Sequence, residues 1–426
     1  FFAFQLGVLA IQPLSDLRVA FTSLAGSPPG HDLPATALTC LNTGGVDWRG
    51  TPFTIRLDVP KDAVQALWCG LDVPEGAQPG RYSGTATVSA AGTAGTPVAV
   101  EVTVLDRVAA EGGANEPWKQ TRLKWLNSTL AQENDVIAPY TPLVVRDQSI
   151  ELLGRRIALA PSGLPAAVQT FFTPEMTAIG ATPTDVLAGP MRLVAEAADG
   201  APLVWATSAP TFTSVTAGTV RWHASSATPA LEMRVEGALE FDGFLAYQIA
   251  ISASRDTELR DLRLEIPYTA KASTFLMGLG RKGGRRPARL EWQWDVAKKN
   301  QDGAWIGGVN AGLAFSLRDE RYVRPLNTNF YLQKPLLLPA SWGNGGRGGI
   351  TIADEEPVTR VRAFSGPRTM RAGETLRYDL QLIVTPFHPI DTDAQWRTRF
   401  YHRFAPVEAI AATGATVVNV HHATPV

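Results

Sequence analysis

Two adjacent histidines, His421 and His422, lie near the end of the chain, directly after the short apolar run 416–420 (TVVNV). A strand that is apolar on both faces is typical of a covered parallel sheet. In parallel barrels, the carboxyl ends of the strands carry the reactive side chains. Neighbouring residues of a strand point to opposite faces, so one of the two histidines can face a barrel mouth. The alternative is a structural histidine that is hydrogen-bonded beneath a loop.

A second stretch, residues 300–332, is denser in amide and aromatic side chains than its neighbours. Its sequence is NQDGAWIGGVNAGLAFSLRDERYVRPLNTNFYL. Five of its side chains can stack on a sugar ring and hydrogen-bond its hydroxyl groups: Trp305, Asn310, Asn327, Asn329 and Tyr331. The alternative is a set of ordinary sandwich strands with capped turns.

Other motifs in the sequence lead to no cofactor. The hexapeptide 278–283 (GLGRKG) matches the dinucleotide fingerprint, but the following GRRP cannot open the helix that the fingerprint needs, so we predict a basic loop. Two adjacent histidines without further ligands do not make a metal site, and Cys40 and Cys69 are badly spaced for zinc. We expect no metal and no dinucleotide, and we favour two buried free thiols over a disulfide.

Composition excludes two classes of partner. The formal net charge is −1 and charged residues make up 19% of the chain, so no basic surplus exists to bind nucleic acid. No uninterrupted apolar stretch reaches about 18 residues, so we expect no membrane span.

Period-two alternation dominates the sequence and predicts an all-β fold. Residues 53–59, 98–104 and 376–384 alternate between apolar and polar side chains, and Gly- and Pro-rich turns separate such runs. We predict an immunoglobulin-like β-sandwich over residues 1–106, a Gly-rich linker over 107–117 and a large β-sandwich over 118–390.

The pattern changes after Pro389. Thr392 and Gln395 can form a capping box, and Trp396, Phe400 and Phe404 are spaced to share one face of a helix. We therefore expect residues 391–426 to hold a short helix and the first strand of a truncated (β/α)8 barrel.

Several segments resemble the N-terminal region of glycoside hydrolase family 123-like proteins over nearly the whole chain. They include RLKWLNSTL at 122–130, MGLGRKGGRRP at 277–287, NQDGAWIGGVNAGL at 300–313, RPLNTNFYL at 324–332 and SGPRTMRAGETL at 365–376. The stretch TPFHPIDTDAQWRTRFYHRF, which runs on to VVNVHHATP, adds to the resemblance. The resemblance implies β-sandwich domains that precede a catalytic barrel, with VVNVHHATP as the first barrel strand and its outgoing loop.

Members proper of that family are retaining β-N-acetylgalactosaminidases, which use the acetamido group of the substrate as nucleophile. Their catalytic Asp-Glu pair lies on a later barrel strand, so the role is not carried over to Asp319-Glu320 or Asp354-Glu355, which we expect to be solvated loop charges.

The resemblance thus implies the non-catalytic N-terminal portion of a glycoside hydrolase, secreted or periplasmic, which acts on glycans such as those with N-acetylhexosamine. Its partners are a glycan substrate and its own missing barrel domain, and His421, His422, Trp305, Asn327 and Asn329 are the candidate substrate-binding residues. One alternative is a stand-alone carbohydrate-binding or adhesion sandwich. Another is a mutarotase- or lyase-like sandwich, which requires converging His, Tyr or carboxylate groups within 118–390.

Overall fold

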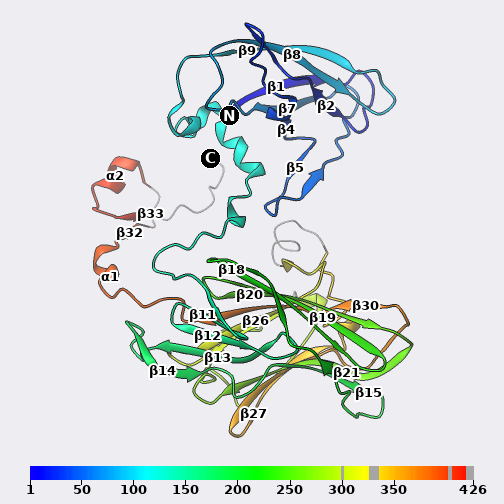
Figure 1. Cartoon of the computed structure of the whole chain (residues 1–426), viewed down its shortest axis with the longest axis vertical. Helices are drawn as coiled ribbons and strands as arrows, with labels where there is room; N and C mark the ends of the chain where they lie inside the picture. Colours follow the sequence, from blue (N-terminus) through cyan, green and yellow to red (C-terminus); the bar gives the residue numbers. More distant parts are fainter. Residues whose placement is uncertain (299–301, 326–334, 402–404, 419–426) are drawn as a thin grey trace. The chain divides into compact units, whose positions relative to one another are not determined.

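The computed structural model describes residues 1–298, 302–325, 335–401 and 405–418 of the 426-residue chain. Strands dominate these residues, which confirms the all-β prediction. The chain divides into two compact units, Phe1–Glu133 and Asn134–Val426 (Figure 1). In the described residues, no helix is long and apolar enough to cross a bilayer.

The first unit is a small sandwich of antiparallel sheets. Its three-stranded sheet has the order β1 (Phe2–Leu9), β7 (Val64–Leu71) and β4 (Leu38–Cys40). In the opposing sheet, β8 (Gly80–Ser89) pairs with β2 (Arg18–Phe21), β3 (Ala25–Ser27) and β9 (Thr96–Val104). A separate hairpin is formed by β5 (Gly44–Val46) and β6 (Pro52–Thr54).

Short 3-10 helices follow β9 where we predicted a linker. They are η2 (Ala110–Gly113), η3 (Pro117–Lys119), η4 (Thr121–Asn127) and η5 (Leu130–Gln132), and η1 (Ala35–Ala37) precedes β4. Asn127 Oδ1 accepts a hydrogen bond from Val46 N at 3.0 Å, and Lys124 pairs with Asp72 at 2.8 Å. Residues 118–133, which we expected in the large sandwich, therefore group with the first unit.

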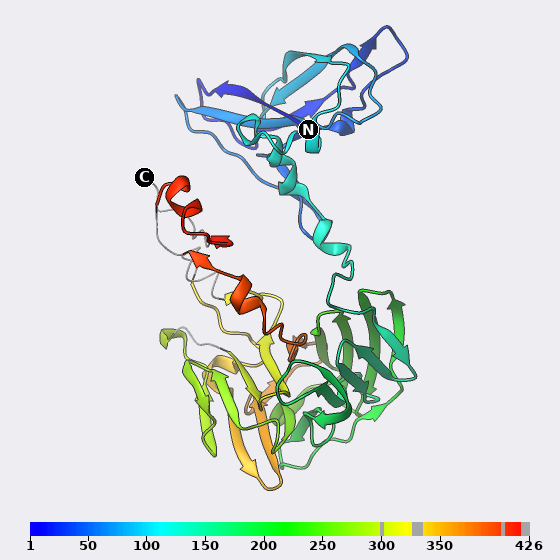
Figure 2. The same ribbon diagram turned by 90° about the vertical axis from the view of Figure 1, so that its left-hand side faces the viewer.

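The second unit stacks two layers of antiparallel sheet around one continuous core. One layer is an eleven-stranded sheet, and the other layer consists of a five-stranded and a six-stranded sheet (Figures 1 and 2). Hydrogen bonds join the layers; for example, Trp222 Nε1 donates to Gly163 O at 2.9 Å, and Tyr268 Oη donates to Leu313 O at 3.1 Å. The alternation of buried and exposed residues places the apolar face of each strand between the layers.

The eleven-stranded sheet has its strands in the order β16 (Ala206–Thr207), β18 (Thr219–Ala227), β19 (Leu231–Glu240), β20 (Phe244–Ala253), β31 (Asp379–Thr385), β26 (Gly312–Arg318), β25 (Gly303–Gly307), β22 (Phe275–Gly278) and β23 (Arg281–Arg285). β17 (Thr211–Val215) also pairs with β18, and β30 (Thr375–Arg377) pairs with β20.

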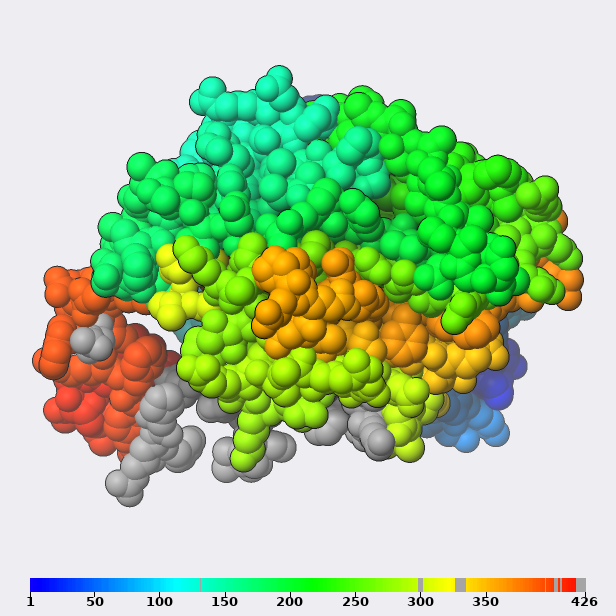
Figure 3. All heavy atoms as spheres, turned by 90° about the horizontal axis from the view of Figure 1, so that it is seen from below, coloured from blue at the N-terminus to red at the C-terminus, as the bar shows by residue number. Residues whose placement is uncertain are grey.

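The other layer combines the two remaining sheets. The five-stranded sheet runs through β10 (Val144–Arg146), β11 (Ser149–Leu152), β12 (Arg155–Leu159), β13 (Pro165–Phe172) and β14 (Ile179–Asp185). The six-stranded sheet has the order β15 (Arg192–Ala197), β21 (Thr257–Thr269), β28 (Val358–Phe364), β27 (Gly349–Glu355) and β24 (Arg289–Gln293), and β29 (Arg368–Met370) pairs with β21. Figure 3 looks onto this layer, where the β27–β28 hairpin is the orange surface near the middle.

The segment after Pro389 has a shorter helix than we predicted, but it has the parallel strand pairing that we predicted. The helix is only α1 (Ala394–Arg397), and Phe400 belongs instead to β32 (Phe400–Tyr401). β32 pairs in parallel with β33 (Val417–Val418) across α2 (Val407–Ala411), so this βαβ arrangement has the parallel pairing that we predicted for the run 416–420. Phe404, which we placed on the helix, lies outside the described residues.

Two predicted loops are also structured. The fingerprint-like residues form the turn of the β22–β23 hairpin, in which Leu279 and Gly280 both have positive φ, and no helix follows the turn. The acids that we predicted as solvated loop charges are bonded: Asp319 is buried and caps Tyr322 N at 2.7 Å, and Glu355 pairs with Arg360 at 2.8 Å. Both partners are close in the sequence, three residues away for Tyr322 and five residues away for Arg360.

Candidate functional site

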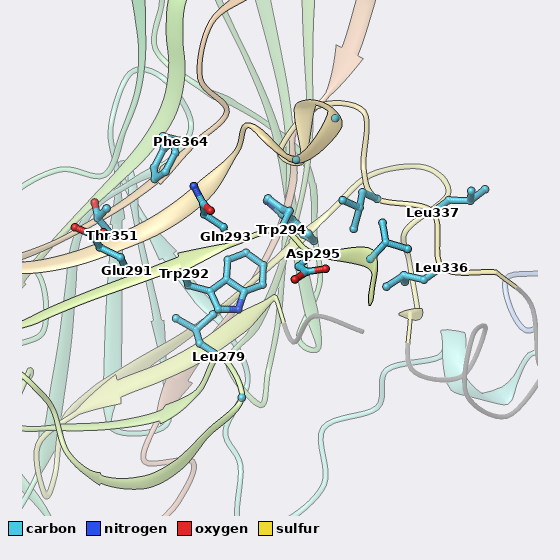
Figure 4. Close-up of a pocket in the computed structure, with 15 residues that line it drawn as sticks. Leu279, Glu291, Trp292, Gln293, Trp294, Asp295, Leu336, Leu337, Thr351 and Phe364 are labelled. Atoms are coloured by element: carbon cyan, nitrogen blue, oxygen red, sulfur yellow. The ribbon is translucent and has the colours of Figure 1, made fainter. Parts of the chain in front are cut away.

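An open cleft of about 1040 Å³ lies along β24, which is an edge strand of the six-stranded sheet. The residues 336–346 face this strand across the cleft (Figure 4). The lining residues are Leu279, Gly280, Glu291, Trp292, Gln293, Trp294, Asp295, Val296, Leu336, Leu337, Leu338, Gly345, Gly346, Thr351 and Phe364. An apolar cleft with a few converging polar groups is the usual form of a small-molecule site.

The central wall of the cleft is the segment 291–295 (EWQWD), which interleaves two tryptophans with three polar residues. Because side chains alternate along a strand, Glu291 and Gln293 project to one face of β24, while Trp292 and Trp294 project to the other. In Figure 4, Gln293 lies toward Phe364 and Trp292 lies toward Leu279. A ligand along this edge thus meets both amide or carboxylate groups and indole rings.

The two tryptophans belong to an aromatic cluster. Trp292 and Trp294 meet edge to face, with ring centroids 4.9 Å apart at 69°. Trp294 in turn meets Tyr322 at 5.5 Å and 81°. Such pairs add about 0.5–1.5 kcal/mol each beyond the area that they bury. The cluster therefore holds the half-buried Trp292 ring in a fixed position at the cleft wall.

Trp294 carries an unusual polar feature. Its side chain is 4% exposed, and within the described chain its Nε1 has no hydrogen-bond acceptor. A buried N–H without a partner costs about 1–3 kcal/mol, so such groups are few in native proteins and need an explanation. Since Trp294 lines the cleft, an acceptor group of a bound ligand is one partner that can relieve this cost.

Leu279 is a strained residue at the same cleft. It has a φ of 51° and is buried, and its N–H donates to Gly303 O at 2.9 Å. Positive φ is costly for a side chain larger than Asn or Asp, and residues of this kind concentrate at functional sites. The turn thereby directs an apolar side chain toward Trp292 (Figure 4).

The opposite end of the cleft pairs an aromatic ring with a hydroxyl group. The Phe364 ring lies close against Gly349, where an added Cβ would come within 2.8 Å of Phe364 Cζ. Thr351 lies directly across from Glu291 in the β24–β27 register. This end of the cleft therefore offers an aromatic ring beside hydrogen-bonding groups, a combination that suits a sugar.

Among the described lining residues, the cleft has two carboxylates, and both are engaged. Glu291 accepts hydrogen bonds from Arg289 Nε at 3.0 Å and Arg289 Nη2 at 2.6 Å. Asp295 Oδ1 accepts from Ala297 N at 2.9 Å. Both carboxylates therefore already have hydrogen-bond donors within the chain. Glu291 and Asp295 are four positions apart in the sequence, and β24 ends between them at Gln293.

A buried ion pair lies beyond the aromatic cluster. Asp302 pairs with Arg318, and Tyr322 lies near both of them. Burial raises the pKa of Asp302 to about 6, although Arg318 opposes this shift. Burial also raises the pKa of the Tyr322 hydroxyl, a group that is neutral near pH 7 even at its ordinary pKa. Neither Asp302 nor Arg318 lines the cleft.

Of the five candidate substrate-binding residues, Trp305 alone is among the residues that the structure describes. Trp305 lies on β25, half-buried on the outer face of the eleven-stranded sheet, with Nε1 donating to Thr385 Oγ1 at 2.8 Å. Its ring lies against Gly307 and Gly312, and it does not line the cleft. Asn327, Asn329, His421 and His422 lie outside the described residues.

Sequence reasoning missed the cleft residues, although one signal was present. The interleaved segment EWQWD is a local signature of an edge strand with aromatic and polar faces. Leu279 and Phe364 give no such signal, because their approach to β24 depends on the sheet order. Neither His nor Tyr occurs among the described residues that line the cleft, so Glu291 and Asp295 are the lining groups of the kind that the mutarotase- or lyase-like alternative requires.

Comparison with known proteins identifies the family. The model described as "Glycoside hydrolase 123, third domain" matches residues 143–386, more than half of the chain and all of the cleft. No curated protein matches the chain.

Three solved structures show distant similarity. A family 123 glycoside hydrolase from Clostridium perfringens is 16% identical at a TM-score of 0.20, with 25% of this chain and 21% of that chain covered. A galactose mutarotase related enzyme from Lactobacillus acidophilus is 6% identical at a TM-score of 0.34, with 58% of this chain and 98% of that chain covered. An aldose epimerase homologue from C. elegans is 8% identical at a TM-score of 0.33, with 57% of this chain and 98% of that chain covered. From the match over residues 143–386, the chain belongs to glycoside hydrolase family 123.

Proposed function

We propose that this chain is a non-catalytic, glycan-binding portion of a glycoside hydrolase that supports a separate (β/α)8 catalytic domain. The observation that carries the proposal is the cleft along β24, which lies inside the residues matched to the family and combines Trp292 and Phe364 with amide, carboxylate and hydroxyl groups. The family description "third domain" also supports a multi-domain protein. The secreted or periplasmic location, the missing barrel as partner and the glycan as ligand belong to the same proposal.

The polar groups of the cleft fit recognition of a neutral sugar. The Gln293 amide supplies donors and an acceptor, and the Thr351 hydroxyl supplies both. The Trp292 indole offers a flat apolar surface, against which the C–H groups of a sugar ring can pack. An N-acetylhexosamine would add an acetamido group, which can pair with an amide such as that of Gln293.

The test is a calorimetric titration of the full chain with N-acetylhexosamine-containing oligosaccharides. Trp292→Ala is expected to weaken binding about fivefold or more, because aromatic anchors of buried contacts contribute about 1 kcal/mol or more. Trp48→Ala is the matched control, since Trp48 is an exposed tryptophan of the first unit. Unchanged binding by Trp292→Ala would contradict the assignment of the cleft.

Two further variants separate the alternatives. Weaker binding by Trp305→Ala, with Trp292→Ala unchanged, would move the site to the outer face of the eleven-stranded sheet. An activity assay of the chain without a barrel domain is expected to release no sugar, and hydrolysis would overturn the non-catalytic role. If a separately expressed barrel domain of the same protein neither binds the chain nor gains activity from it, the stand-alone binding or adhesion module is the better description.

A further inference from the structure

A second cavity, of about 570 Å³, lies on the six-stranded sheet where β29 pairs with β21. Three arginines line it, Arg260, Arg347 and Arg368, and Glu258 is the one acid among the described lining residues. The remaining lining residues are Ala198, Leu259, Pro367 and Thr369. The cavity therefore has a surplus of positive charge.

The three arginines differ from others on the same sheet. Within the described chain, none of them lies within ion-pair distance of a carboxylate. In contrast, Arg263 pairs with Glu196 at 2.6 Å and Arg360 pairs with Glu355 at 2.8 Å. The three lining arginines therefore lack the carboxylate partner that Arg263 and Arg360 have.

The guanidinium group of Arg368 is held in place by contacts within the chain. Its Nη2 donates to Ser341 O at 2.6 Å, and its guanidinium lies 5.8 Å from the centre of the Tyr378 ring. Its Nε is buried and has no acceptor in the part of the chain that the structure describes. Burial lowers the pKa of Arg368, which reflects the cost of holding this charge away from water. A bound anion would offset this cost.

Local backbone features direct the other two arginines. In the register of β15 and β21, Asp261 lies opposite Glu196, and Leu259 lies opposite the next residue, Ala197. Arg260 therefore has no residue opposite it and is the extra residue of a β-bulge. Bulges re-aim side chains and are frequent next to binding sites.

Arg347 is held by a buried neighbour. Its Nη2 donates to Asn344 Oδ1 at 2.8 Å, and Asn344 is itself anchored by donating to Ser365 O at 2.7 Å and Pro367 O at 3.0 Å. Arg347 is thus presented from a rigid turn and still has donors to offer.

We propose that this cavity binds an oxyanion, a carboxylate or sulfate group carried by a glycan. Guanidinium groups present paired N–H donors that match the two oxygens of such a group, and charge-assisted hydrogen bonds of this kind are strong. The anion site stands on the arginine geometry alone, and only the choice of a glycan as the carrier rests on the proposed function.

The two cavities share one turn. Gly345 and Gly346 line the cleft, and the next residue, Arg347, lines the arginine cavity. Consecutive Cα atoms lie about 3.8 Å apart, so the two sites adjoin across this turn. One oligosaccharide can therefore place a neutral unit against Trp292 and an acidic or sulfated unit against the arginines.

The first experiment titrates the full chain with inorganic sulfate at low ionic strength. The Arg260→Ala/Arg347→Ala double variant is expected to lose at least about tenfold in affinity, because two charge-assisted contacts are removed. Arg347→Lys, which keeps the charge and loses the planar fork, should fall between this variant and the wild type. Arg234→Ala, which removes an exposed arginine paired with Glu232 on the other layer, should leave binding unchanged.

The second experiment compares matched neutral, uronate-containing and O-sulfated oligosaccharides. Tighter binding of the uronate or the sulfated form, abolished by the double variant, would support the proposal and identify the group. No sulfate binding by the wild type, or an equal loss in Arg234→Ala, would overturn it. If Trp292→Ala leaves all glycan binding intact while the double variant removes anion binding, the cleft proposal fails and the anion site stands.

Discussion

The interiors of the two units differ in continuity. In the second unit one core runs between the layers from Leu143 to Val384. The first unit divides its apolar residues between two smaller clusters, one around Cys40, Cys69 and Leu67 and the other around Leu24 and Tyr82. A continuous core gives a stiff platform that can hold a cleft and a charged cavity, whereas a divided core depends more on individual contacts. We therefore expect a change in one unit to alter the unfolding of that unit alone.

The largest effect is expected at Arg155, which is 1% exposed. Its guanidinium donates to Leu153 O, Asp242 O, Val384 O and Phe387 O at 2.7–3.0 Å and has no carboxylate partner among the described residues. Arg155→Ala leaves these carbonyls without donors, so it should destabilise the second unit by about 4 kcal/mol. Differential scanning calorimetry of the full chain should show the loss in one transition.

Arg156→Ala is the matched control for Arg155. Arg156 is the next residue and makes a surface pair with Glu151 at 3.2 Å, which should contribute less than about 1 kcal/mol. A comparable loss from both variants, or a shift of both unfolding transitions together, would break the comparison between the units.

The second effect concerns the two cysteines of the first unit, which are free and buried. Cys40 and Cys69 are directly opposite in the β4–β7 pair, and the hydrogen bond from Leu41 N to Trp68 O makes theirs the closer, non-hydrogen-bonded kind of position. The hydrogen bond between the thiols lowers the pKa of Cys40, which favours the reactive thiolate. Mild oxidation should join them and stabilise the first unit by about 3–4 kcal/mol.

Intact-mass measurement before and after oxidation checks this prediction through the loss of two hydrogens. The rise in unfolding temperature should be confined to the first unit and absent from Cys40→Ala. An oxidising extracellular location would make the bond the resident form. Resistance of the native protein to oxidation would contradict the prediction.

The third effect compares two strand glycines, one in each unit. At Gly237 of β19, an added Cβ would lie 2.2 Å from Trp222 Cε2, and Trp222 is fixed by its bond to Gly163 O. Gly237→Ala should therefore cost about 1–3 kcal/mol. At Gly7 of β1 no atom lies within 4 Å of the added Cβ, so Gly7→Ala should change stability by less than about 0.5 kcal/mol. Urea unfolding of both variants measures the difference.

The alternation of apolar and polar residues predicted strands well where a partner strand pairs along the whole segment. Residues 98–104 lie in β9, and residues 376–384 lie in β30 and β31 with a break at Tyr378. Residues 53–59 alternate equally well, yet only β6 (Pro52–Thr54) forms, because alternation cannot show whether a partner is present. The helical spacing of Trp396 and Phe400 failed for the same reason, since Phe400 pairs with Val417.

The candidate site shows the same division between local and non-local information. The segment 291–295 could be recognised from its own residues as an aromatic and polar edge. Nothing local shows that Leu279 adopts a positive φ beside it, or that Phe364 reaches it across β27 and β28. The unpaired state of Arg260 and Arg347 is likewise visible only in the folded sheet, where neighbours such as Arg263 and Arg360 have carboxylate partners.

The smallest expected effect on stability concerns Glu355, a charge of the six-stranded sheet that has arginine partners, in contrast to the unpaired arginines of the cavity. Arg362 and Arg360 lower the pKa of Glu355 to about 2. Since the folded pKa lies below the ordinary value, the stabilisation is full above about pH 4.5 and is lost as the pH falls toward 2. The carboxylate is 37% exposed, so solvent screening reduces the effect of Glu355→Gln to about 1 kcal/mol at pH 7. Urea unfolding from pH 7 to pH 3 should show this difference shrinking, with Glu232→Gln, a single exposed pair, giving less at every pH. If sulfate stabilises wild type and Glu355→Gln equally, the bound anion acts at the unpaired arginines and not at those freed by losing Glu355.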